Sequence, residues 1–170
     1  CKESKPAIMG IQEIRTGSKR KIVKLAVQGY VTVSGSPDTA ILIREDLKIV
    51  EKGTIEDIED LPHEFVQVET TYGKFRFVNV YSREGKLKTE HLHRLEGFGK
   101  STFIMGDFNA KHRMFLTHNQ IRDSNKNGDT LYKYLFAQDP YGQDSLLHCH
   151  NVNSPNVYTR AIEDKWVQLD

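Results

Sequence analysis

The stretch "FIMGDFNAKH", residues 103–112, decides which fold we expect for this chain. Its first three residues are apolar and typical of a buried strand, which ends at a glycine followed by Asp107 and Asn109. Glycine at position 106 lets the backbone turn sharply because it carries no Cβ atom. Asp, Asn and Gly also favour ordinary turns, so a strand-end turn with no further role is the alternative interpretation.

Other predicted strands carry polar residues of the same chemical kind near their ends. The run "PAIMGIQEI" (6–14) leads to Glu13, "KFRFVNVYS" (74–82) carries Asn79 and Tyr81, and "KWVQLD" (165–170) ends at Asp170. Carboxylate oxygens suit hard cations such as Mg²⁺, and a carboxylate can deprotonate an attacking water. Asn and Tyr can donate hydrogen bonds to phosphoryl oxygens, where charge builds in the transition state. The set therefore suits metal-assisted phosphate chemistry.

The remaining sequence predicts strands and helices in alternation. Two alternating runs around Thr71-Tyr72-Gly73 predict a β-hairpin, with Val66 and Val68 on one face of the first arm. Further strands are predicted for 39–46, 47–53 and 145–151, and helices for 18–29, 88–100 and 127–139. In the last helix, Leu131, Leu135 and Phe136 are expected on the buried side, whereas His91 and His93 in 88–100 are expected to be solvated. Such a mixture predicts α/β layers, with sheets inside and helices outside.

Composition bounds the class of protein. The chain has 170 residues, 38% hydrophobic and 28% charged, which predicts one soluble globular domain over 1–170 with no membrane span. Its net charge of +1, from 24 basic and 23 acidic residues, does not announce a nucleic-acid binder but allows a local basic face. Two cysteines give no disulfide framework, which favours a reducing compartment. Because the sequence begins with Cys1, we expect a fragment of a longer chain.

Four motifs carry a family resemblance. "IQEI", "VNVYS", "GDFNAKH" and "WVQLD", in this order, resemble the endonuclease/exonuclease/phosphatase superfamily. Within it, "GDFNAKH" followed by "NKNGDTLYKYL" and "NSPNVYT" is most similar to the endonuclease domains of non-LTR retrotransposons, which are similar to apurinic/apyrimidinic endonucleases. The resemblance implies a four-layered α/β (α+β) sandwich of two packed mixed or antiparallel sheets with helices on the outside.

The resemblance also implies a role for each site residue. Glu13 matches the metal-binding glutamate, Tyr81 an aromatic that contacts the scissile phosphate, and Asp107 the aspartate that positions or activates water. Asn109 matches the asparagine that holds Asp107 and the phosphate, and Asp170 an aspartate near the active site. Lys111 and His112 are then expected near the substrate backbone, and Asn79 is a further candidate for substrate binding. From the residues alone, Tyr81 could instead be a core aromatic and Asn79 a satisfied buried amide.

The implied cofactor is Mg²⁺, with Mn²⁺ as an alternative, and the implied partner is the phosphate backbone of DNA. A reverse transcriptase domain in a longer parent chain and a nuclear or cytoplasmic location follow from the same resemblance. The sequence departs from the family in lacking an initial strand with an asparagine and a final Ser-Asp-His segment, so we expect a sandwich incomplete at both ends. Two alternatives stay open: a non-catalytic remnant, or a phosphoesterase acting on an inositol phosphate, sphingomyelin or an RNA end.

Overall fold

The computed structural model describes residues 5–14, 25–97, 101–115, 124–136, 160–162 and 165–167. The chain forms two compact units, and each is described by itself. The first unit comprises Cys1–Tyr81 and Phe98–Gly106, and the second comprises Ser82–Gly97 and Asp107–Asp170.

One sheet of the first unit has three antiparallel strands. These are β1 (Ile8–Gln12), β2 (Tyr30–Ser36) and β3 (Thr39–Arg44), in the order β1-β3-β2. The central strand β3 is the most buried, because its Ala40–Ile43 run is apolar on both faces. The predictions for β1 and β3 are confirmed, whereas β2 has no counterpart in the sequence analysis.

The other sheet of the first unit is mixed. Its order is β4-β5-β6-β7, formed by β4 (Lys48–Gly53), β5 (His63–Thr70), β6 (Gly73–Tyr81) and β7 (Thr102–Asp107). The first three strands are antiparallel, and the predicted hairpin joins β5 to β6 through Thr71 and Tyr72. Strand β7 runs parallel to β6, since the Arg76 N–H donates to Ser101 and Gly106 lies against Val80 farther along both strands.

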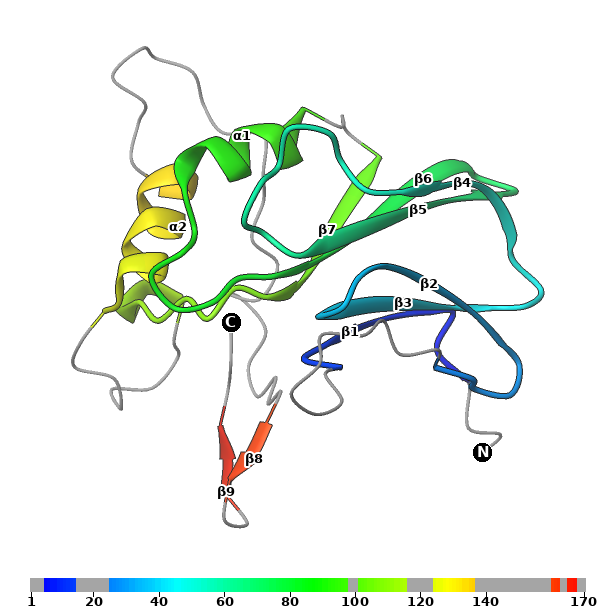
Figure 1. Ribbon diagram of the computed structural model, residues 1–170, viewed down its shortest axis with the longest axis horizontal. Helices are drawn as coiled ribbons and strands as arrows, with labels where there is room; N and C mark the ends of the chain where they lie inside the picture. The colour runs from blue at the N-terminus through cyan, green and yellow to red at the C-terminus, as the bar shows by residue number, and fades with distance from the viewer. Residues whose placement is uncertain are drawn as a thin grey trace. The chain divides into compact units, whose positions relative to one another are not determined.

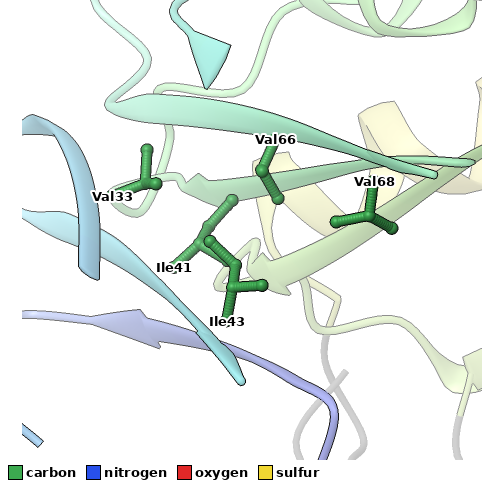
Figure 2. Packing of buried hydrophobic residues seen from close by; sticks show 5 residues of the cluster. All are labelled: Val33, Ile41, Ile43, Val66 and Val68. Atoms are coloured by element: carbon green, nitrogen blue, oxygen red, sulfur yellow. The ribbon is translucent and has the colours of Figure 1, made fainter. Parts of the chain in front are cut away.

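The two sheets lie face to face (Figure 1). Val33, Ile41 and Ile43 of the three-stranded sheet meet Val66 and Val68 of the mixed sheet, and all five point toward one another in Figure 2. Phe75 and Phe77 pack against this cluster, as expected if they share a face of β6. The predicted α/β sandwich of two packed sheets is confirmed.

The second unit contains the helices α1 (Thr89–Glu96) and α2 (Lys126–Phe136), the short 3-10 helix η1 (Arg113–Phe115) and the hairpin β8 (Arg160–Ile162) to β9 (Lys165–Val167). The two α-helices contact each other, and the Tyr134 hydroxyl donates to the Glu96 carboxylate. Among the helices of the described residues, none is long and apolar enough to cross a bilayer.

Three sequence predictions need correction. Residues 25–29 are not helical: Gly29 lies in a turn with φ of +84° that leads into β2. His91 is buried rather than solvated, and its Nδ1 accepts the Lys88 N–H at the start of α1. Phe136 is 47% exposed rather than buried. Two further predictions lie outside the described residues: the first part of the predicted helix, 18–24, and the predicted strand at 145–151.

Candidate active site

Glu13 and Tyr81 form one cluster of predicted site residues, in the first unit. Glu13 follows the last residue of β1 and is exposed, with a left-handed backbone at φ of 57°. Tyr81, the last residue of β6, is buried, and its hydroxyl donates a hydrogen bond of 2.6 Å to Glu13 Oε1. In this structure the Tyr81 hydroxyl donates its hydrogen to the Glu13 carboxylate. For Tyr81 to donate to a phosphate, this hydrogen bond would have to break.

Asn79 lies two residues before Tyr81 but is fully buried. Its Oδ1 accepts the Gln12 amide, and its Nδ2 lies 2.9 Å from Glu64 Oε1. Both ends of the side chain are thus engaged inside the protein. The expectation that Asn79 binds the substrate stays a prediction, and it requires a ligand to displace these internal hydrogen bonds.

Asp107 and Asn109 form a second cluster, in the second unit. The Asn109 backbone N–H donates to Asp107 Oδ1 at 2.8 Å, and Asn109 Nδ2 lies 3.3 Å from Asp107 Oδ2. Asn109 Nδ2 also donates to the Ser82 carbonyl at 2.9 Å. Asn109 has a φ of 45°, a left-handed conformation that Asn tolerates better than most residues. The predicted relation between the two residues, in which Asn109 holds Asp107, is what the structure shows.

Two asparagines at the start of α2 secure this turn, and the sequence analysis did not assign them. Asn125 donates to the Asn109 carbonyl at 2.8 Å, and its Oδ1 accepts the Gly128 N–H as a helix cap. Asn127 is fully buried, donates to the Phe108 carbonyl at 2.7 Å and accepts the Leu87 N–H. The only signal was the repeated Asn in "NKNG", which is also the composition of an ordinary turn.

Lys111 and His112 follow the turn but differ in character. The Lys111 side chain is exposed, as a phosphate contact requires. His112 is buried and stacks on Tyr132, with ring centroids 4.1 Å apart. Burial lowers the pKa of His112, with Arg113 adding to the effect and Asp129 opposing it. The prediction that His112 contacts the substrate stays a prediction, and its burial leaves little of the imidazole accessible in this structure.

The structure therefore describes the predicted residues in two groups. Glu13, Tyr81 and Asn79 belong to the first unit, and Asp107, Asn109, Lys111 and His112 belong to the second. Asp170 lies outside the described residues.

The donors present fit a Mg²⁺ ion that keeps most of its waters. Within the described residues, no group of three or more His, Cys, Asp or Glu side chains could enclose a metal. Mg²⁺ does not need such a cage, because it commonly binds through one or two carboxylates and substrate phosphate. Glu13 supplies one exposed carboxylate whose orientation is fixed by Tyr81, and Mn²⁺ accepts the same oxygen ligands.

Comparison with known proteins agrees with this combination of sandwich fold and polar turn. A model of the Endonuclease/Exonuclease/phosphatase family matches residues 1–160. The chain belongs to this family. No curated protein matches the chain.

Two solved structures of D. rerio TDP2 are similar to the chain. One is complexed with a single strand DNA product (17% identity), and the other is humanized by 14 mutations (16% identity). Each covers 63% of this chain with a TM-score of 0.46. The chain in turn covers 49% and 51% of them, so it spans about half the length of these structures.

Proposed function

We propose that the chain is a metal-dependent phosphodiesterase domain that nicks DNA by attack of water on a phosphodiester. The observation that carries the proposal is the Asp107–Asn109 turn, in which Asn109 binds both oxygens of the Asp107 carboxylate. A carboxylate is a suitable acceptor for the proton of a water molecule. Membership of the endonuclease/exonuclease/phosphatase family supports the same reaction class.

Asp107 is assigned to the attacking water. Its carboxylate orients the water and accepts its proton as the oxygen attacks phosphorus. Asn109 keeps that carboxylate in one orientation through hydrogen bonds of 2.8 and 3.3 Å, and Asn127 fixes the backbone between them at Phe108. A general base held in position in this way contributes about 10²–10⁴ to the rate.

Glu13 is assigned to the cation and Tyr81 to the orientation of Glu13. When bound, Mg²⁺ would neutralise phosphate charge and assist the leaving oxygen. Tyr81 holds Glu13 Oε1 at 2.6 Å. We keep the contact of Tyr81 with the scissile phosphate, and the role of Asp170 near it, as parts of the proposal. Lys111, which is exposed beside the turn, would bind the DNA backbone electrostatically.

DNA is the proposed substrate, and a non-LTR retrotransposon is the proposed origin. The support is the sequence "GDFNAKH" followed by "NKNGDTLYKYL". The structure gives the second motif a physical role, because its Asn125 and Asn127 bind the backbone of the first motif. A reverse transcriptase in a longer parent chain belongs to this proposal as partner, and an intracellular location, nuclear or cytoplasmic, goes with it.

Nicking of supercoiled plasmid DNA with Mg²⁺ tests the function. Asp107→Asn keeps the size of the side chain and removes its basicity, so we expect nicking to fall by about 10²–10⁴. The matched control is Asp46→Asn, which removes an exposed carboxylate bonded to Arg44 and should leave the rate unchanged. EDTA should abolish nicking. A folded chain that nicks no faster than its Asp107→Asn variant would instead be a non-catalytic remnant of the family.

A further inference from the structure

Four polar side chains interrupt the otherwise apolar contact between the two sheets of the first unit. Gln12 lies opposite Thr39 in the β1–β3 pair, and Glu64 lies opposite Asn79 in the β5–β6 pair. Thr39 donates to Glu64 Oε2, Asn79 Nδ2 lies 2.9 Å from Glu64 Oε1, and Gln12 Nε2 donates to Asn79 Oδ1. We call Gln12, Thr39, Glu64 and Asn79 the polar quartet. Three members are 0% exposed, and Gln12 is half-buried.

The chemistry of the quartet fixes which way each amide faces. Asn79 Nδ2 lies within 3.1 Å of three acceptors: the Ile11 carbonyl, the Ala40 carbonyl and the Glu64 carboxylate. Only an NH₂ group satisfies such surroundings, so Asn79 must turn its oxygen toward Gln12. Gln12 must then present its own NH₂ to Asn79. With its NH₂ group bound to Asn79, Gln12 has its carbonyl oxygen Oε1 as an acceptor. Among the described residues, no donor binds this oxygen.

The close approach of Gln12 to Asn79 depends on a residue without a side chain. A Cβ atom at Gly10 would lie 2.5 Å from Asn79 Oδ1 and 3.3 Å from Gln12 Nε2. Real Cβ atoms do not come this close to a polar oxygen. The glycine therefore creates the space in which the two amides meet.

The side chains of Gln12 and Glu13 both bind residues of β6. Successive residues of an extended strand point to opposite faces, but Glu13 leaves the strand with a φ of 57°. Gln12 binds Asn79 and Glu13 binds Tyr81, and these two partners share one face of β6 because they are two residues apart. The carboxylate proposed for the cation and the oriented amide of Gln12 are thus anchored side by side on β6.

We propose that Gln12 is a positioning residue of the cation site, whose oxygen Oε1 accepts a hydrogen bond from a water of a hydrated divalent cation held by Glu13. The polar quartet supplies the amide orientation that this contact needs. The inference rests on the proposed function, because it takes Glu13 to be the cation ligand. A water bridge of this kind suits Mg²⁺ and Mn²⁺, which retain several waters when bound to protein.

Binding of Mn²⁺, followed by the electron paramagnetic resonance signal of the free ion, tests the inference without DNA. We expect Gln12→Leu to raise the dissociation constant for Mn²⁺ about tenfold, as loss of an outer-shell partner commonly does. Glu13→Gln should remove the site altogether. The matched control is Gln67→Leu, the same substitution at another half-buried glutamine on β5 outside the quartet, which should bind Mn²⁺ as the unmodified chain does.

The outcomes separate this inference from the proposed function. If Glu13→Gln loses Mn²⁺ and Gln12→Leu, shown to be folded by circular dichroism, binds it unchanged, Gln12 has no positioning role and the proposed function stands. If Glu13→Gln binds Mn²⁺ like the unmodified chain, or neither binds it, the cation assignment falls and the role of Gln12 with it. Should Gln12→Leu fail to fold, Gln12→Met removes the same two polar atoms with a flexible side chain of similar length.

Discussion

Among the described residues, four non-glycine residues have a positive φ: Glu13, Asp57, Asp60 and Asn109. Two of them, Glu13 and Asn109, belong to the candidate site. Their φ angles are 57° and 45°, in the left-handed region that few residues other than glycine adopt. For Asn109 the short amide bonds nearby groups and offsets the cost. Glu13 has no such local means, and its conformation persists with a hydrogen bond from Tyr81. Left-handed residues of this kind cluster at functional sites, and both of these lie in the clusters that carry the proposed reaction.

His112 makes stability depend on pH. Burial lowers the pKa of His112 below the 6.5 of an exposed imidazole. The unfolded chain therefore binds more protons than the folded chain once the pH falls through 6.5, and the free energy of unfolding decreases. The contribution is complete above that pH and is lost progressively as the pH falls toward the lower, folded-state pKa.

We expect urea unfolding between about pH 8 and about pH 5.5 to show this decrease. His112→Phe keeps an aromatic ring for Tyr132 and removes the titration, so its free energy of unfolding should vary less over the same range. An equal pH dependence in both proteins would contradict the assignment to His112.

At the scale of elements, the parallel pairing of β6 and β7 depends on Gly106. A Cβ atom there would lie 2.0 Å from the Val80 carbonyl oxygen, and the φ of +142° suits glycine alone. Gly73 has a similar φ of +125°, but nothing lies within 4 Å of the Cβ that it lacks. A substitution at either glycine incurs the cost of an unfavourable φ, but only a substitution at Gly106 also incurs a clash with Val80. Comparing the two variants therefore isolates the cost of the clash.

Gly106→Ala should lower the free energy of unfolding by at least about 2 kcal/mol more than Gly73→Ala, because only the first substitution forces two strands apart. Urea unfolding of both variants measures the difference. Equal losses would show that β7 can shift away from β6 at little cost.

The elements that sequence reasoning found are those with strong local patterns. Alternation in 64–82 predicted β5 and β6, and the apolar run before Gly106 predicted β7. Strand β2 was missed because its apolar residues are few and a bulge between Val33 and Ser36 breaks its register. The spacing of Ile22, Leu25 and Ala26 indicated a helix, yet Leu25 and Ala26 are not helical. Apolar spacing over so short a run does not distinguish a helix from an irregular segment.

For the molecule as a whole, the ends of the predicted strands supplied most of the candidate site residues. They supplied Glu13, Tyr81, Asp107 and Asn109, whose roles stay predictions. They could not identify Glu64 or Asn127, because the roles of these side chains depend on pairing between distant strands and on packing at the start of a helix. The burial of Asn79 and His112, which are 0% and 8% exposed, could not be predicted from the sequence either, because burial is a property of the tertiary fold.

Glu13 and Asp107 are both assigned to one reaction by the proposed function. Glu13→Gln and Asp107→Asn should each slow plasmid nicking, and the double variant should be no more than about tenfold slower than the slower single variant. Groups that act in one step lose their joint effect once either is gone, whereas independent contributions multiply. A multiplicative loss in the double variant would contradict the assignment of both residues to one reaction.

Gly10 has a consequence for how this protein and its relatives can diverge. Asn79 occupies the position that a side chain at residue 10 would need. A larger residue at position 10 is therefore compatible only with a smaller residue at position 79. A side chain at Gly10 alone would clash with Asn79, although the two residues belong to different sheets and lie far apart in the chain. Substitutions at these positions should therefore appear in pairs across a lineage, and such correlated changes would trace the contact between the two sheets through evolution.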